Sequence, residues 1–181
     1  MFKKTLVKIM ISMAALMLVL SVNPAQAAEK KIMLKVPVCF PTALPGLGSA
    51  APWLAERMEL ASGGSLKMKV YEPGKLVAPF EILDAVSKGK INAGYATAAY
   101  WAGKIPAAPI FSAIPFGPEA GEYLAWMYYG NGLKLYQEMY DQAGYNVKVL
   151  ICSIIAPETS GWFTEPITGP EQLKGLRMRF F

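Results

Sequence analysis

The sequence contains no histidine and only two cysteines, Cys39 and Cys152. Without imidazole, the chain has no Ser-His or Cys-His nucleophilic dyad, no histidine-ligated zinc and no imidazole acid–base chemistry. Both cysteines lie in apolar, strand-like stretches, which predicts buried free thiols, with an oxidised pair as the alternative in an exported protein. Phosphate-loop, nucleophile-elbow and C-x-x-C motifs are also missing, and the acidic residues are dispersed. These absences favour a protein that is not an enzyme.

A long apolar run is missing everywhere except near the N-terminus. Residues 1–27 open with lysines, continue through the apolar stretch Ile9–Val22 and end on small residues at Ala25 and Ala27. This pattern predicts a signal peptide that is cleaved after Ala27, and the stretch is shorter than the roughly 18–20 residues that a membrane anchor needs. Removal of the leader lysines reduces the net charge of +5. The mature chain therefore lacks the basic character of a nucleic-acid-binding protein.

Strand and helix signals alternate along the mature sequence, which predicts an α/β fold with a largely parallel sheet. We expect a helix to start at the Thr168-Gly-Pro-Glu171 capping pattern. The chain ends inside the strand predicted over 176–181. We therefore expect Phe181 to be a truncation point, and we expect the isolated mature chain, which would lack the rest of its fold, to be poorly stable. The stretch 97–118 is rich in proline and is expected to be an aromatic loop. Strands are expected at 31–40, 66–71, 91–96, 145–155 and 176–181, and helices at 53–61, 79–88, 119–129 and 133–143.

A glycine motif between the first strand and the first helix suggests one alternative function. Gly46-Leu-Gly48-Ser-Ala-Ala51 fits the G-x-G-x-x-A pattern of dinucleotide-binding folds, and Glu72 lies near the position of the acid that binds ribose. Residues 41–45 separate the strand from the glycines, however, so the tight turn at the pyrophosphate is missing. A secreted nucleotide-dependent oxidoreductase remains an alternative, and an ordinary loop is the simpler interpretation.

Aromatic and basic residues supply the candidate binding groups. Tyr100 and Trp101 follow the predicted strand 91–96, and ligands of open α/β sheets bind beyond the carboxyl ends of strands. We therefore expect both rings to line a ligand cleft, with packing of Trp101 inside the domain as the alternative. Arg177 and Arg179 share one face of the last predicted strand, and arginine is suited to bidentate recognition of a carboxylate.

Several segments carry a resemblance to a known family. They are the signal peptide, residues 71–76, 81–91 and 115–117 and, most specifically, residues 173–179 (Leu-Lys-Gly-Leu-Arg-Met-Arg). These segments resemble the DctP-type substrate-binding proteins of tripartite ATP-independent periplasmic (TRAP) transporters. Residues 100–104, 125–130 and 161–163 look like the subgroup that binds 2-oxo acids and related monocarboxylates.

The resemblance implies an α/β, periplasmic-binding-protein-like fold of two lobes that close on an organic acid. Residues 28–144 would form the first lobe, and residues 145–181 the hinge-crossing strand and the start of an incomplete second lobe. The implied function is a periplasmic, non-enzymatic receptor that delivers a 2-oxo acid or related carboxylate to the membrane permease of a TRAP transporter. Dimers occur in the oxo-acid subgroup, so a second copy is another expected partner. A sensor-associated binding protein and a nonfunctional fragment remain alternatives.

The resemblance also assigns roles to two charged residues. The carboxylate-gripping arginine of the family maps to Arg179. Glu158 replaces a glutamine that helps the oxo-acid subgroup to hold a cation beside the substrate. A carboxylate next to an anionic substrate favours a doubly charged bridging ion, so calcium is expected first and sodium second, without an organic cofactor. The alternative is an ion pair of Glu158 with Arg179 or Lys104.

Overall fold

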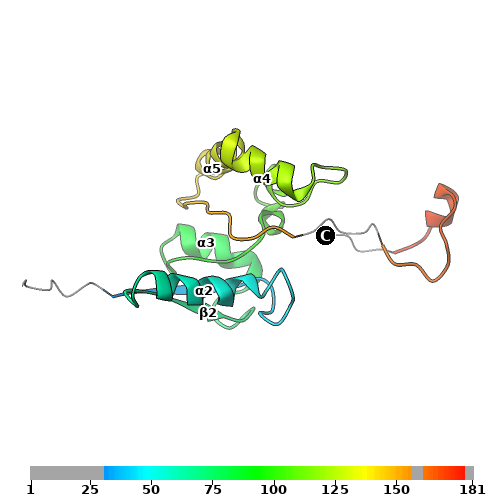
Figure 1. Ribbon diagram of the computed structural model, residues 1–181. Coiled ribbons are helices and arrows are strands. Elements are labelled where there is room, and N and C mark those ends of the chain that lie inside the picture. The colour runs from blue at the N-terminus through cyan, green and yellow to red at the C-terminus, as the bar shows by residue number, and fades with distance from the viewer. Residues whose placement is uncertain (1–30, 156–160, 178–181) are drawn as a thin grey trace, which may run out of the picture. The chain divides into compact units, whose positions relative to one another are not determined.

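The computed structural model describes residues 31–155 and 161–177 of the chain (Figure 1). The predicted signal peptide lies outside these residues. No helix within them has the length and hydropathy needed to cross a bilayer. The elements are β1 (Ile32–Pro37), α2 (Ala50–Ala61), β2 (Leu66–Tyr71), η1 (Pro79–Glu81), α3 (Ile82–Ser87), η2 (Ala98–Trp101), η3 (Ala108–Phe111), α4 (Ala120–Tyr129), α5 (Gly132–Gln142) and η4 (Pro170–Leu173), where η denotes a 3₁₀ turn.

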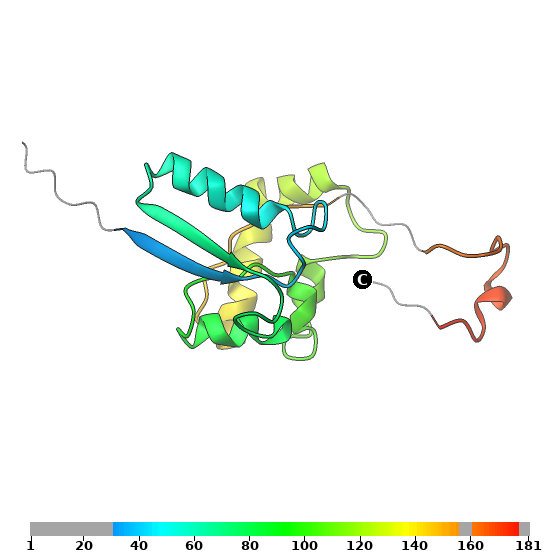
Figure 2. The same ribbon diagram turned by 90° about the horizontal axis from the view of Figure 1, so that it is seen from below.

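A β-α-β unit forms the N-terminal part of the fold. β1 and β2 pair in parallel from Ile32 opposite Leu66 to Pro37 opposite Tyr71. Parallel neighbours need a crossover connection, and α2 supplies it and packs against β2 (Figure 2). Glycine at position 64 has a φ of +84° and donates to the Glu59 carbonyl at 2.8 Å, which ends the helix. The predictions of a helix that stops before Gly64 and of a strand over 66–71 are confirmed.

The strand predicted over residues 91–96 is reduced to one parallel bridge between Val38 and Tyr95. An asparagine side chain explains the difference: Oδ1 of Asn92 accepts a hydrogen bond from the Lys35 amide of β1 at 3.2 Å. This contact takes the place of a main-chain ladder bond. A Cβ on Gly94 would lie 2.2 Å from Cγ2 of Ile82, so this backbone lies directly against α3. The prediction of a regular strand here was wrong.

The strand predicted over residues 145–155 is also absent from the described structure, where this segment is irregular. Instead of a neighbouring strand, the side chain of Gln137 on α5 forms hydrogen bonds with the backbone of this segment. This side chain donates to the Val147 carbonyl at 2.8 Å and accepts from the Val149 amide at 3.0 Å. The amide of Asn146 donates to the Ser87 hydroxyl at 3.0 Å. Side chains thus satisfy backbone groups that a sheet would otherwise pair.

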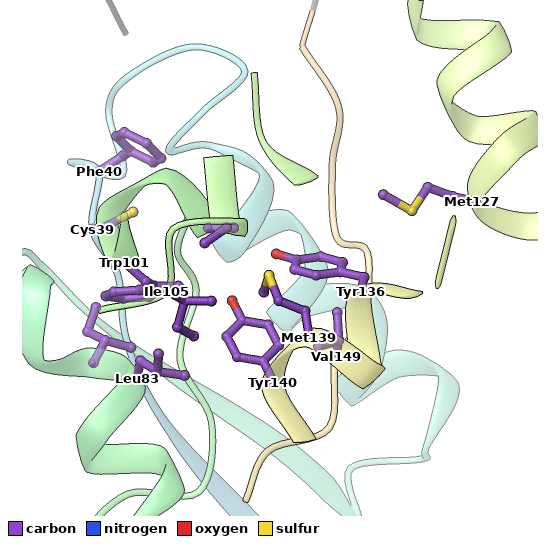
Figure 3. Packing of buried hydrophobic residues seen from close by; sticks show 13 residues of the cluster. Cys39, Phe40, Leu83, Trp101, Ile105, Met127, Tyr136, Met139, Tyr140 and Val149 are labelled. Atoms are coloured by element: carbon purple, nitrogen blue, oxygen red, sulfur yellow. The ribbon is translucent and has the colours of Figure 1, made fainter. Parts of the chain in front are cut away.

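The central hydrophobic cluster is formed by side chains from the segment after β1, from α3, from the turns η2 and η3, and from the helix pair α4–α5 (Figure 3). α5 begins at Gly132, and its backbone there lies directly against α4, because a Cβ on this glycine would lie 2.8 Å from the Trp126 ring.

The two cysteines have different environments: Cys39 is buried and Cys152 is exposed, and both are free. Burial raises the pKa of Cys39 to about 11, so its thiol stays protonated and is a poor nucleophile. The expected burial is thus correct for Cys39 alone.

The C-terminal described segment, residues 161–177, contains the one-turn helix η4. Gln172, and not the predicted Glu171, completes the capping interaction: its Oε1 accepts from the Gly169 amide and the Thr168 hydroxyl, both at 3.1 Å. The cap is therefore shifted by one residue, to Gly169 and Gln172, and the Gln172 amide takes the role that the sequence pattern assigned to the Glu171 carboxylate. The strand predicted from residue 176 falls mostly outside the described residues.

Candidate functional site

The candidate site is the edge of the sheet at which its parallel segments end. Residues 38–48 leave β1, residues 72–81 leave β2, and residues 96–101 follow the Tyr95 bridge. Connections at the carboxyl ends of parallel strands form the ligand-binding crevice of open α/β proteins. The sequence predicted a ligand at this edge, and these three connections supply the side chains described below.

The loop after β1 is closed on itself by backbone hydrogen bonds. The amides of Gly48 and Ser49 both donate to the Leu44 carbonyl, at 2.9 and 3.0 Å, and the Ala51 amide donates to the Gly48 carbonyl at 3.4 Å. A Cβ on Gly48 would lie 1.8 Å from the Pro41 carbonyl oxygen, so this position requires glycine. The glycine motif therefore serves the turn, and amides that a pyrophosphate would need are already paired.

Glu72 fastens the same loop to the end of β2. Its carboxylate accepts hydrogen bonds from both the amide and the hydroxyl of Thr42, the former at 3.2 Å. Hydrogen bonds to a charged acceptor are stronger than neutral ones. Glu72 therefore has a partner within the loop, which does not favour the ribose-binding role that the dinucleotide alternative gave it.

Tyr95 connects three segments that are distant in the sequence. Its backbone bridges the β1 extension, and its hydroxyl donates to the Leu47 carbonyl at 2.7 Å. The same hydroxyl lies 2.9 Å from Oγ of Ser153, which must then be the donor to it. Burial raises the pKa of Tyr95, so the phenol stays protonated at neutral pH. This residue ties the segment 145–155 to the candidate site.

Tyr100 and Trp101, which the sequence assigned together to the cleft, have different environments. Trp101 is only 4% exposed and belongs to the core cluster, beside Ile105 and Tyr140 in Figure 3. Tyr100 is half-buried and stacks on Phe80, with a centroid distance of 4.9 Å. The packing alternative thus describes Trp101 better, because its core position leaves it little surface for a ligand. The ligand-binding role of Tyr100 stays a prediction.

Lys104 forms a charged cluster with two acidic residues, Glu81 of η1 and Asp84 of α3. Its ammonium donates to the Phe80 carbonyl at 3.2 Å and pairs with Glu81 at 3.5 Å and with Asp84. An ammonium has three donors, and these three acceptors account for them. Pairing with Glu158, the alternative partner considered from the sequence, would require one of these contacts to break.

The Lys104–Asp84 pair makes the stability of the fold depend on pH in a defined direction. The hydrogen bond with Lys104 lowers the pKa of Asp84 below its ordinary 3.8, and the same bond raises the pKa of Lys104 above its ordinary 10.5. The stabilisation from Asp84 is therefore complete above pH 3.8 and is lost as the pH falls through the lower folded pKa. The contribution of Lys104 is complete below pH 10.5 and is lost as the pH rises through the higher folded value.

We expect Lys104→Met to lower the free energy of unfolding by about 1 kcal/mol at neutral pH, because the pair is only partly shielded from solvent. Urea unfolding at pH 7 and at about pH 2.5 measures the effect, and the difference from wild type should shrink at the lower pH. Lys134→Met is the matched control, since it removes an exposed pair with Glu138 at 3.7 Å. An equal loss for Lys104→Met at both pH values would contradict the assignment.

The two charged residues assigned through the family resemblance, Arg179 and Glu158, lie outside the described residues. Their neighbours Arg177 and Trp162 are exposed, Trp162 at 92%. Among residues 31–155 and 161–177, no three histidine, cysteine or acidic side chains are grouped in a way that could hold a metal ion. The roles of Arg179 and Glu158 therefore stay predictions.

Sequence reasoning did not identify two aromatic residues at this edge, Phe40 and Phe80. Phe40 is 7% exposed and its ring lies 5.8 Å from that of Tyr100, edge to face. Phe80 is 60% exposed although its ring stacks on Tyr100. Each follows the end of a different strand, and that position was the available signal. The sequence had instead placed Phe80 within the helix predicted over residues 79–88.

The chain is similar to proteins that bind small carboxylates. It is 31% identical over 157 residues to a monocarboxylate 2-oxoacid-binding periplasmic protein of Nostoc, which covers 87% of this chain and 42% of that protein. A TRAP solute-binding protein of Bordetella bronchiseptica, solved with calcium and picolinate, matches 83% of this chain and 44% of its own with a TM-score of 0.76 and 26% identity. One from Colwellia psychrerythraea, with calcium and pyruvate, matches 83% of this chain and 45% of its own, with a TM-score of 0.71 and 32% identity.

The chain thus spans less than half the length of these relatives. Their structures confirm the predicted α/β fold of the two-lobed periplasmic-binding-protein type. The sequence pattern of DctP, bacterial extracellular solute-binding protein family 7, matches residues 44–181. The chain belongs to family 7 of the bacterial extracellular solute-binding proteins.

Proposed function

We propose that the chain carries the first lobe and the hinge-side start of the second lobe of a periplasmic receptor for 2-oxo acids or related small carboxylates. The receptor binds its ligand without chemical change and delivers it to the permease of a TRAP transporter. Residues 28–144 form the first lobe, residues 145–181 begin the second, and the signal peptide is cleaved after Ala27. The observation that carries the proposal is the 32% identity and 0.71 TM-score with a calcium- and pyruvate-bound relative.

The geometry of the first lobe supports this function. Two connections at the carboxyl ends of the parallel segments supply the exposed Phe80 ring and the half-buried Tyr100 ring, which suit the organic part of a small acid, and the buried Phe40 ring supports Tyr100 from the core side. Arg179 supplies the charge that grips the carboxylate, because its planar fork matches a planar anion. The glycine loop does not favour the nucleotide-dependent oxidoreductase, since its amides bond within the loop.

A cation beside the substrate is part of the proposal. One relative described above was solved with calcium and pyruvate. A TRAP solute-binding protein of Pseudoalteromonas atlantica was solved with sodium and pyruvate, and it matches 64% of this chain and 35% of its own with 32% identity and a TM-score of 0.59. The carboxylate of Glu158 is a hard oxygen ligand of the type that calcium takes. It also adds a negative charge beside the substrate anion, which a doubly charged cation balances better than sodium does. We therefore assign Glu158 to the cation, with calcium as the preferred ion.

Removal of calcium from the full-length receptor should weaken the binding of pyruvate by about tenfold or more, because the acid and Glu158 then repel each other. Isothermal titration before and after chelation, with calcium or sodium restored, measures this change. Glu158→Gln should shift the preference from calcium toward sodium. Glu165→Gln, at an exposed position of the same segment, is the control and should leave the preference unchanged. Equal pyruvate affinity of the metal-free and calcium-loaded protein would contradict the bridging cation.

A further inference from the structure

Three aromatic rings from three different connections meet at the carboxyl edge of the sheet. Phe40 follows β1, Phe80 lies in η1 after β2, and Tyr100 lies in η2 after the Tyr95 bridge. Tyr100 is the central ring: it meets Phe80 at 4.9 Å with the planes 23° apart, and Phe40 at 5.8 Å with the planes 61° apart. The topology therefore brings together residues that are 20 or more positions apart in the sequence.

The three rings differ in how much surface they leave open. Phe40 is 7% exposed and packs in the core, and Tyr100 is half-buried between its neighbours. Phe80 remains 60% exposed although one face of its ring is stacked. A large apolar surface that is held in place and still open to solvent suits contact with the apolar part of a ligand.

Lys104 fixes the geometry of this pair of rings. It lies three residues beyond η2 and donates to the Phe80 carbonyl at 3.2 Å. Its ion pairs with Glu81 and Asp84 anchor the ammonium to the start of α3. The lysine thereby ties the turn that carries Tyr100 to the turn that carries Phe80.

The charges around the rings discriminate between classes of acid. Glu81 is 59% exposed in its side chain and pairs with Lys104, and Asp84 pairs both with Lys104 and, at 3.7 Å, with Lys88, so both lysines of this cluster already have acidic partners. A second carboxylate on a ligand would meet these acids instead of a free cation. An apolar tail would meet the Phe80 ring.

We infer that Phe80 is a specificity-determining residue of the first lobe, which stacks with Tyr100 to hold the apolar tail of a bound monocarboxylate, and that Lys104 is its positioning residue. The inference rests on the proposed function and deepens it by naming the ligand class. That class is 2-oxo monocarboxylates with an aliphatic side chain longer than the methyl group of pyruvate. Contact with the ring should raise affinity about fourfold for each added methylene.

The test is a calorimetric titration of the full-length receptor with pyruvate, 2-oxobutanoate, 2-oxopentanoate and 2-oxoglutarate in the presence of calcium. For the wild type we expect affinity to increase along the three monocarboxylates and to fall by about tenfold or more for the dicarboxylate. Phe80→Ala should remove the increase, so that the three monocarboxylates bind with similar affinities. Phe80→Leu, which keeps an apolar side chain without the planar ring, should retain part of the increase. Leu60→Ala is the control, since Leu60 is 64% exposed on α2.

The positioning role of Lys104 is tested by the same series. Lys104→Met should flatten the dependence on chain length, and Lys104→Arg should restore it, because arginine can make the same ion pairs. A general loss of stability would instead weaken the binding of every acid alike. A chain-length dependence that persists unchanged in Phe80→Ala would overturn the inference and leave the proposed function intact. A folded wild type that binds no acid would overturn the proposed function and the inference with it.

Discussion

Replacement of Arg179 by alanine is expected to weaken binding of the organic acid by two or more orders of magnitude. The reason is that truncation of one member of a buried, hydrogen-bonded charge pair costs about 2–5 kcal/mol, much of it from the partner charge left without a counterion. Arg179→Lys should also bind poorly, because lysine offers a point charge and cannot form two parallel N–H···O bonds. Calorimetry on the full-length receptor with pyruvate measures both variants.

Arg177 is the matched control for this experiment. It is exposed, it lies two residues before Arg179, and in an extended segment it shares the same face. Arg177→Ala should leave pyruvate affinity within about threefold of wild type, since an exposed charge contributes little. If Arg177→Ala weakened pyruvate binding and Arg179→Ala did not, the carboxylate would be bound by Arg177 and the assignment of Arg179 would be wrong.

Trp101→Ala is expected to lower the free energy of unfolding by about 3–5 kcal/mol, the usual cost of removing a large aromatic side chain from a core. Trp101 is 4% exposed, meets Tyr100 edge to face at 6.3 Å and belongs to the central cluster. Burial in the same cluster raises the pKa of Tyr140, so its phenol also stays protonated at neutral pH. Urea unfolding followed by circular dichroism measures the loss.

Two further variants separate packing of Trp101 from ligand contact. Trp101→Phe keeps an aromatic ring, so it should fold and bind pyruvate within about threefold of wild type while losing part of the stability. Trp53→Ala removes an indole that is 58% exposed on α2 and should cost less than about 0.5 kcal/mol. If the Trp101→Phe protein had wild-type stability but no longer bound pyruvate, Trp101 would have to contact the ligand, and its assignment to the core alone would be wrong.

Local patterns predicted the parts of the fold that local chemistry determines. The alternation over 66–71 and the glycines after Ala61 gave the limits of β2 and of the end of α2 correctly. The two predicted strands that failed, 91–96 and 145–155, are apolar enough to be strands. Side chains from elsewhere in the sequence pair with the backbone at these places: Asn92 bonds to β1, and Gln137 bonds to residues 147–149. Such tertiary contacts leave no trace in periodicity.

The same distinction applies to the site. The rule for carboxyl ends of parallel strands located the edge and selected Tyr100, and it applied equally to Trp101 one position later. Whether a ring in a short 3₁₀ turn faces the core or the edge depends on packing, which placed Trp101 inside. Phe80 lies in the segment 79–88 that was predicted as one helix, but it belongs to the turn η1 before α3, where its ring stacks on Tyr100 and stays 60% exposed.

Titration of the full-length receptor with pyruvate in the presence of calcium tests the central proposal most directly. A receptor for small carboxylates should give saturable binding of one acid per chain. The Kd should be about 1 μM or lower, which corresponds to a binding free energy of about −8 kcal/mol or more favourable. The same protein should give no heat with a nicotinamide dinucleotide. A folded receptor that binds the dinucleotide, or that binds neither pyruvate nor any longer 2-oxo acid, would contradict the account.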